Sequence, residues 1–182
     1  MPGGGKSTVG RHLARRLSLP MVDSDQVIEQ RIGMSIRSFF EREGEERFRE
    51  LEESVISELA ASFQGVLATG GGVVLREANR RALREHSTVL YLTTTPEALF
   101  RRLRFDSKRP LLSVADPLTR LRELYAARDP LYTETAHFSV ATGRASIPML
   151  VSTILTQLEL AGLIDPNTIP SIVDPPAPPS PS

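Results

Sequence analysis

The chain opens on the second half of a phosphate-binding loop. Such a loop reads G-x-x-x-x-G-K-[ST], and residues 3–8, G-G-G-K-S-T, supply its final part. Because glycine has no Cβ, successive backbone amides can turn inward and hold phosphate oxygens at the start of a helix. Lys6 would then reach the β- and γ-phosphates of a nucleotide, and the Ser7 hydroxyl would bind Mg²⁺. A flexible glycine-rich tag is the alternative, but the helical pattern that begins at Lys6 favours phosphate binding.

Apolar residues recur along the chain with two different spacings. Short extended runs are expected at 19–23, 66–69, 88–93 and 137–140. Helical spacing is found at 6–17, from Ser24 as N-cap to Gly33, in a longer segment after Gly44, and at 76–86, 96–104, 118–128 and 147–160. This alternation predicts an α/β protein with a parallel sheet and helices on both faces.

Composition excludes several classes of protein. The 182 residues carry 22 basic and 22 acidic side chains and no cysteine. Zero cysteines exclude a disulfide framework, a thiolate nucleophile and a zinc ribbon, and zero net charge gives no footprint for nucleic acid or an anionic membrane surface. No apolar run reaches the length of a membrane span and no secretory leader opens the chain, so we expect a soluble cytoplasmic protein.

Proline marks the end of the globular part. Of the 14 prolines, seven lie in the last 17 residues. We therefore expect one domain over residues 1–162 and a disordered tail over 163–182. Overlapping P-x-x-P spacings in D-P-P-A-P-P-S-P-S would fit an SH3-like groove, but disorder without a partner is the simpler interpretation.

A few charged residues stand out as candidates for chemistry. Asp23 and Asp25 follow an expected strand, so one carboxylate could face a magnesium ion while the other faces a substrate hydroxyl; helix capping is the alternative. Arg49 would by default pair with Glu45 or Glu53 on the polar face of a helix. Arg128 at a helix end would favour the dipole there, but paired guanidinium groups could also hold a carboxylate.

Six fragments together resemble the shikimate kinases. They are G-G-G-K-S-T-V-G-R at 3–11, V-D-S-D at 22–25, F-F-E-R-E-G-E-E-R-F-R at 39–49, T-G-G-G at 69–72, R-P-L-L at 109–112 and R-D-P-L-Y at 128–132. Their order and spacing match over about residues 2–160. The resemblance implies transfer of the ATP γ-phosphoryl group to the 3-hydroxyl of shikimate, a step of chorismate and aromatic amino-acid biosynthesis.

The resemblance also implies a role for each matching residue. Asp25 would contact the shikimate hydroxyls as the candidate base, Ser7 and Asp23 would organise Mg²⁺, and a lid over about 104–116 would exclude water. Arg49, Arg128, Gly70, Gly71 and Gly72 would form the shikimate pocket, with Lys6 and Arg109 acting on the phosphates. ATP would be bound by Gly3, Gly4, Gly5, Lys6, Ser7, Thr8, Arg109 and, in a loosely matching region, Arg102 and Arg144.

The family's fold is a three-layer P-loop kinase fold with five parallel strands in the order 2-3-1-4-5. The first strand would precede the phosphate loop, and residues 1–182 do not contain it. Losing it would remove about five buried apolar side chains at roughly 1.5–3 kcal/mol each. We therefore expect the native product to start about ten or more residues upstream of Met1. A cooperative unfolding transition of the 182-residue chain would contradict this expectation.

Other interpretations keep the fold or reject the activity. The arginines would also suit a gluconate kinase or a nucleoside monophosphate kinase, although the triple glycine favours shikimate. An inactive fragment that binds a partner through its tail is the third possibility. The expected partners are shikimate and ATP, without nucleic acid or membrane, and we expect a monomer.

Overall fold

The computed structural model describes residues 5–103, 116–143, 145–165 and 167. Several expected site residues therefore lie outside the described part, as do most of the expected lid and tail. The side chain of Arg102 is also not described, although its backbone belongs to a helix. The residues wholly outside are Gly3, Gly4, Arg109 and Arg144.

Helices and strands alternate as the sequence predicts. The strands are β1 (Met21–Asp23), β2 (Val66–Ala68), β3 (Leu90–Thr93) and β4 (Phe138–Ala141). The helices are α1 (Lys6–Leu17), α2 (Ser24–Ile32), α3 (Ile36–Ser62), the short η1 (Val73–Leu75), α4 (Glu77–His86), α5 (Pro96–Leu103), α6 (Pro117–Thr135) and α7 (Ile147–Leu160). The bounds of α1 and α7 are those expected from apolar spacing alone.

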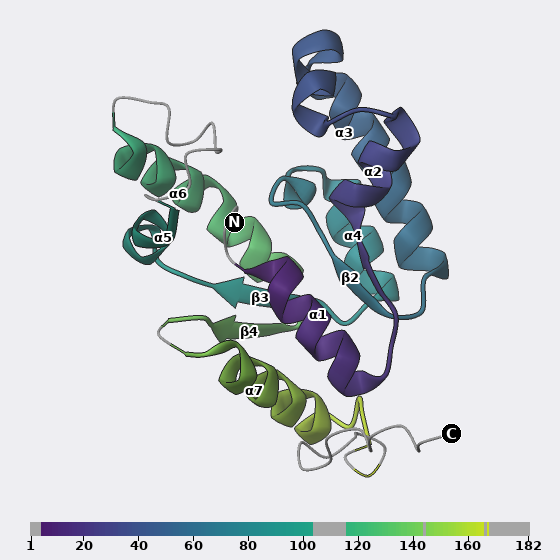
Figure 1. The fold of residues 1–182 in the computed structure, drawn as a ribbon, viewed down its shortest axis with the longest axis vertical. Coiled ribbons are helices and arrows are strands. Elements are labelled where there is room, and N and C mark those ends of the chain that lie inside the picture. Colours follow the sequence, from purple (N-terminus) through teal and green to yellow (C-terminus); the bar gives the residue numbers. More distant parts are fainter. Residues whose placement is uncertain (1–4, 104–115, 144, 166, 168–182) are drawn as a thin grey trace, which may run out of the picture.

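The described strands form two separate parallel pairs. β1 pairs with β2 so that Val22 lies opposite Leu67, and β3 pairs with β4 so that Leu92 lies opposite Val140. In Figure 1, α1 crosses the middle of the molecule, β3 and β4 lie beside α7, and β2 packs against α1. The α/β class is confirmed. The single five-stranded order stays a prediction, because the described residues form two pairs rather than one sheet.

Apolar side chains gather in three clusters. The first packs α3, α4, α5 and α6 around β3, with Ile56, Leu99 and Leu121 fully buried. The second joins α1 and α7 to β3 and β4, and includes every member of the expected α7 stripe. The third lies between α2 and α3 and is built on Ile28, Phe48 and Val55. The α2–α3 unit therefore has a small core of its own beside the strands.

Helix α3 extends further toward the N-terminus than expected, and α6 extends further toward the C-terminus. A first helical stretch of α3 begins at Ile36, and the expected longer helix follows the break at Gly44, where φ is 83° and the backbone is not helical. Glycine tolerates this conformation, so the turn signal does mark the start of the longer helix. Helix α6 runs through Pro130 to Thr135, because its last turns bury Tyr132 and Thr135 against the core. Arg128 is consequently inside a helix, so the expected dipole role at a helix end is wrong.

A channel separates β2 from β3. One cavity of about 520 Å³ is lined by residues of α1, β2, β3 and α7, among them Leu13, Val66 and Leu90. A second cavity shares Thr69, Leu83, Val89 and Leu90 with it and extends to Lys6 and Tyr91. Open space therefore runs between the two strand pairs as far as the start of α1.

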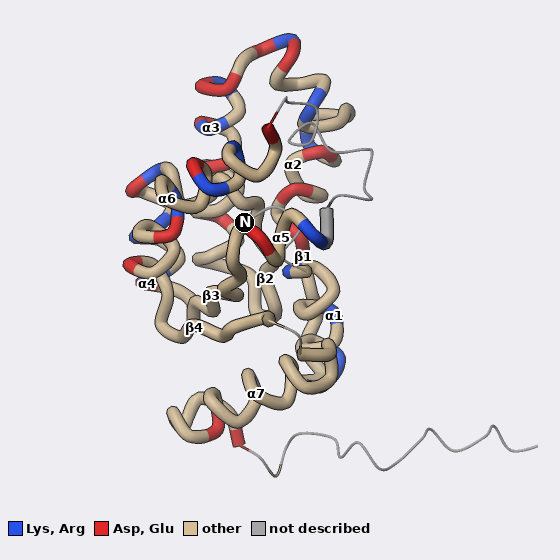
Figure 2. Tube along the Cα trace, turned by 90° about the vertical axis from the view of Figure 1, so that its left-hand side faces the viewer, with Lys and Arg blue, Asp and Glu red and all other residues tan. Residues whose placement is uncertain are grey.

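Charge is unevenly distributed over the molecule. Figure 2 shows acidic and basic residues crowded on α3 and α6, whereas β2, β3, β4 and most of α7 carry none. None of the described helices is both long enough and apolar enough to cross a membrane. Residues of β2, β3, β4 and α7 contribute to the second apolar cluster.

Candidate active site

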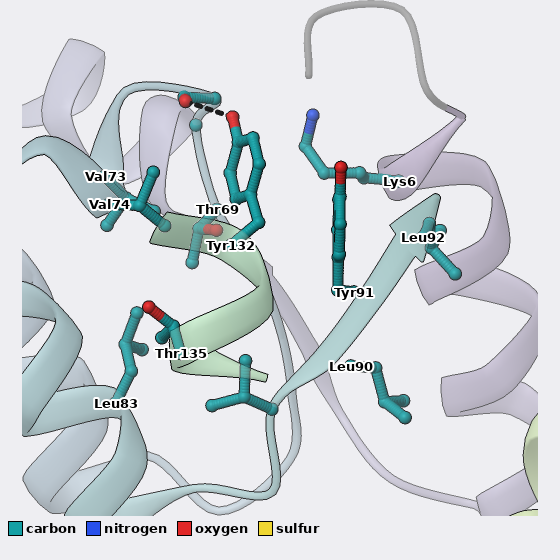
Figure 3. Close-up of a pocket in the computed structure, with 13 residues that line it drawn as sticks. Lys6, Thr69, Val73, Val74, Leu83, Leu90, Tyr91, Leu92, Tyr132 and Thr135 are labelled. Atoms are coloured by element: carbon teal, nitrogen blue, oxygen red, sulfur yellow. Dashed lines mark hydrogen bonds between the residues drawn. The ribbon is translucent and has the colours of Figure 1, made fainter. Parts of the chain in front are cut away.

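The end of the phosphate loop is placed at the start of α1. Gly5 is the N-cap residue and has a φ of 75°, a conformation that favours glycine. Its carbonyl accepts the first helical bond, from Val9 N at 2.9 Å. The amides that follow have no helical partner of their own, so the helix start is suited to an anion. Lys6 extends from here toward the cavity beside Tyr91 (Figure 3).

Asp23 is placed to serve two purposes. Its Oδ1 accepts a hydrogen bond from Asp25 N at 3.0 Å, so Asp23 caps α2 in place of the expected Ser24. Its Oδ2 accepts a bond from the Ser7 hydroxyl at 2.8 Å. The capping role and the contact with the phosphate loop therefore coexist in one carboxylate.

The Ser7–Asp23 pair offers oxygen ligands of the kind that Mg²⁺ prefers. Among the described residues, no group of three or more His, Cys, Asp or Glu side chains could hold a metal ion. Mg²⁺ in nucleotide sites is typically bound through one or two protein oxygens, together with water and phosphate oxygens. A hydroxyl and a carboxylate that meet beside a phosphate loop fit that requirement.

Asp25 lies directly against the glycine loop that follows β2. A Cβ placed on Gly70 would lie 2.6 Å from Asp25 Oδ1. Burial raises the pKa of the Asp25 carboxyl to about 6, with further upward contributions from the charges of Asp23 and Glu52, while Lys6 lowers it. A carboxylate with this pKa can accept a proton near neutral pH.

Arg49 is buried, not exposed on a polar helix face. It forms ion pairs with Glu45 at 3.1 Å and with the buried Glu52 at 2.7 Å, so the Glu45 pair is confirmed and the Glu53 alternative is wrong. The guanidinium also lies 5.2 Å from the ring centroid of Phe48. A Cβ on Gly72 would collide with this guanidinium, which places Arg49 against the glycine loop.

The glycine loop is tied to α2 and α6 by hydrogen bonds. Gly70 N donates to the buried Ser24 hydroxyl at 3.3 Å. The Gly71 carbonyl accepts one bond from Arg128 Nη1 at 3.2 Å and another from the Tyr132 hydroxyl. Arg128 therefore reaches the same loop as Asp25 and Arg49, although the three come from different helices.

Some expected residues meet here and others are not placed. The structure brings Asp25, Arg49 and Arg128 together around residues 70–72, and it brings Ser7 and Asp23 together at the start of α1. Thr8 lies in the first turn of α1 and is partly exposed. The predicted roles of the undescribed Gly3, Gly4, Arg102, Arg109 and Arg144 stay predictions.

Three residues of the site were not expected from the sequence. Ser24 was expected only as a helix cap, and it instead holds Gly70. Glu52 lies three residues after Arg49, a spacing at which helical side chains meet, and this could have indicated it. Tyr132 lies one turn beyond Arg128 within R-D-P-L-Y, so its helical spacing is the only signal.

The arrangement combines two functions at neighbouring strand ends. Asp23 ends β1 and the glycine loop follows β2, so both groups lie beyond the carboxyl ends of paired strands, where α/β sheets bind ligands. One part offers backbone amides, Lys6 and a site for a cation. The other offers a carboxylate with a raised pKa and two guanidinium groups, which suits an anionic substrate that loses a proton.

Comparisons with known proteins match this chain to one family. The family model described as shikimate kinase matches residues 2–159. A shikimate kinase of Paracidovorax citrulli is 60% identical over 170 residues, covering 92% of this chain and 93% of the relative. A solved shikimate kinase from Acinetobacter baumannii, in complex with shikimate, is 42% identical with a TM-score of 0.80 and covers 90% of each chain.

A gluconokinase from Sinorhizobium meliloti shows how far the fold extends. It is 18% identical to this chain, with a TM-score of 0.54, and covers 87% of each. That likeness shows the fold alone.

The identity of the relatives and the extent of the family match are sufficient to conclude that the chain belongs to the shikimate kinase family.

Proposed function

We propose that Asp25, Arg49 and Arg128 bind shikimate and that the phosphate-loop side binds ATP. As a member of the shikimate kinase family, the chain transfers the γ-phosphoryl group of ATP to the 3-hydroxyl of shikimate. One observation carries the assignment of residues: a base and two guanidinium groups from three helices converge on the same three glycines. Phosphoryl transfer depends mainly on such positioning and on charge neutralisation.

Arg49 and Arg128 would hold the shikimate carboxylate. Guanidinium groups bind a carboxylate through paired N–H donors, which fixes both the position and the orientation of the bound molecule. Glu52 is 2% exposed and fixes one side of Arg49, and Phe48 lies beside the guanidinium plane. Arg49 is therefore oriented before the substrate arrives, so less conformational entropy is lost when it binds.

Asp25 would accept the proton of the attacking hydroxyl. The new bond forms between the shikimate oxygen and the γ-phosphorus, the bond to the ADP oxygen breaks, and the hydroxyl proton passes to an Asp25 Oδ. Burial favours the neutral acid, so proton uptake by Asp25 relieves a desolvated charge. Because Gly70 has no side chain, the glycine loop and this carboxylate can approach each other closely.

Ser7 and Asp23 would hold Mg²⁺, and Lys6 would contact the phosphates. When bound, Mg²⁺ neutralises phosphate charge that develops during transfer. The helix start at Gly5 adds backbone donors to the same anion site. We extend the proposal to Gly3, Gly4 and Thr8 in the loop, to Arg109 over the phosphates, to a water-excluding lid at 104–116, and to Arg102 and Arg144 near adenine.

We also propose that a fifth strand belongs in the channel between β2 and β3. Among the described residues, β2 and β3 each pair on one side only, and the open space between them is lined by apolar side chains of both strands together with some polar residues. The channel reaches Lys6, so a strand entering the phosphate loop would lie within it. A strand there would join the two pairs into one sheet. If the added strand is counted as the first and β1 to β4 as the second to fifth, the order is 2-3-1-4-5.

The choice of acceptor tests the proposed function directly. Production of ADP is measured with shikimate, gluconate or a nucleoside monophosphate as acceptor, and we expect turnover with shikimate only. The Arg49→Gln and Arg128→Gln variants should raise the KM for shikimate at least about tenfold, because each removes a charge-assisted contact. The exposed Arg47→Gln variant is the control and should behave as the parent. Equal turnover of gluconate would contradict the assignment.

The raised pKa of Asp25 predicts a particular pH profile. Asp25 must be ionised to accept a proton, so kcat/KM for shikimate should fall as the pH drops through about 6. A carboxyl of ordinary pKa would keep this quantity constant to well below pH 5. Steady-state kinetics between about pH 4.5 and 8.5 would measure it. The Asp25→Asn variant should still bind shikimate but turn over poorly. A midpoint near pH 4 would be inconsistent with the proposed base.

A strand supplied at the N-terminus should stabilise the protein. The added segment would contain about six apolar residues of high strand propensity and end in Gly directly before Met1, which completes the G-x-x-x-x-G-K-S pattern. We expect the extended chain to unfold cooperatively, with a thermal midpoint at least about 10 °C above any transition of the 182-residue chain, since several apolar side chains become buried. An extension of equal length made of Gly and Ser is the control. Equal midpoints for the two extended chains would rule out a fifth strand in the channel.

A further inference from the structure

Tyr132 lies where α6 meets the glycine loop. Its ring is stacked on that of Tyr91, with centroids 4.9 Å apart and planes inclined at 24°, and the residue is only 8% exposed. Its hydroxyl donates a hydrogen bond to the carbonyl of Gly71, drawn as a dashed line in Figure 3. The stacking fixes the direction of the ring, so this hydroxyl is held at the loop.

The Gly71 carbonyl also accepts a bond from Arg128. The Arg128 Nη1 donor lies 3.2 Å from this oxygen, and a carbonyl oxygen has two lone pairs and can accept both bonds. When Arg128 binds a substrate carboxylate, its guanidinium has to share or leave the Gly71 carbonyl. A part-buried carbonyl left without a donor would oppose that exchange.

We propose that Tyr132 is a positioning residue that keeps the Gly71 carbonyl hydrogen-bonded while Arg128 turns to the substrate carboxylate. The inference rests on the proposed role of Arg128 in holding shikimate. With the Tyr132 hydroxyl present, the Gly71 carbonyl keeps one hydrogen-bond donor whether Arg128 contacts the loop or the substrate. Without this hydroxyl, the Gly71 carbonyl would lose its donor when Arg128 turns to the substrate.

Neighbouring contacts support the assignment. The Tyr91 hydroxyl donates to Asp129 Oδ1 at 2.7 Å, so the other ring of the stack is anchored to the residue that follows Arg128. Burial raises the pKa of the Tyr132 phenol, although Arg128 lowers it in part, so the hydroxyl keeps its proton and remains a donor at neutral pH. The two tyrosines thus bind Asp129, the residue that follows Arg128, and Gly71, whose carbonyl Arg128 also contacts.

Removal of one hydroxyl tests the inference. Tyr132→Phe keeps the stacked ring and the packing, so the fold is retained, as circular dichroism would verify. Calorimetric titration of the full chain with shikimate should show binding weakened about fivefold, the usual effect of one hydrogen bond, with ATP binding unchanged. Tyr125→Phe removes a hydroxyl of the same helix that interacts with Asp129 and not with Gly71, so it is the control for loss of a tyrosine hydroxyl as such. Unchanged shikimate affinity in Tyr132→Phe would overturn the inference.

A second background separates positioning from a general structural effect. In the Arg128→Gln variant, adding Tyr132→Phe should weaken shikimate binding by no more than a further twofold or so, because the exchange no longer occurs. The same fivefold loss in both backgrounds would show that Tyr132 does not act through Arg128. If the parent chain failed to bind shikimate, the proposed site itself would be wrong, which is a different outcome from equal binding by parent and variant.

Discussion

The site depends on the space that glycine leaves free at positions 70 and 72. Asp25 and the Arg49 guanidinium lie where a Cβ on these residues would be, so the loop backbone and the functional side chains share one small volume. Gly72 has a φ of −93°, which any residue can adopt. Its requirement for glycine therefore comes from the approach of Arg49 and not from backbone strain.

Further contacts make this close approach possible. Glu52 is buried with Arg49 and neutralises its charge. Without this partner, the buried guanidinium would be strongly unfavourable. Ser24 and Tyr132 hold the loop from opposite helices, through the Gly70 amide and the Gly71 carbonyl. Asp23 links this region to the phosphate loop through Ser7, so the two halves of the site are fixed relative to each other.

Local patterns in the sequence predicted most elements, and long-range contacts account for the differences. The bounds of helix α7 were predicted correctly because its apolar residues recur at helical spacing along its whole length. The expected helix ended at Arg128, but α6 continues through Pro130 to Thr135. Local sequence does not reveal that Tyr132 and Thr135 pack against the core and extend the helix. The convergence of Asp25, Arg49 and Arg128 was implied by family resemblance alone, since spacing cannot bring three helices to one loop. Glu52 and Tyr132 were missed because a buried acid and a loop-binding phenol resemble ordinary helix residues.

The contrast between Gly70→Ala and Gly72→Ala tests this account most directly. A methyl group at 70 would displace Asp25, whereas one at 72 would displace Arg49. Kinetics with shikimate should therefore show Gly70→Ala lowering chiefly kcat and Gly72→Ala raising chiefly the KM for shikimate, each by about tenfold or more, with the KM for ATP nearly constant. Parent-like kinetics in both variants, or equal effects on kcat and both KM values, would contradict the claim that the two glycines admit a base and a carboxylate-binding group.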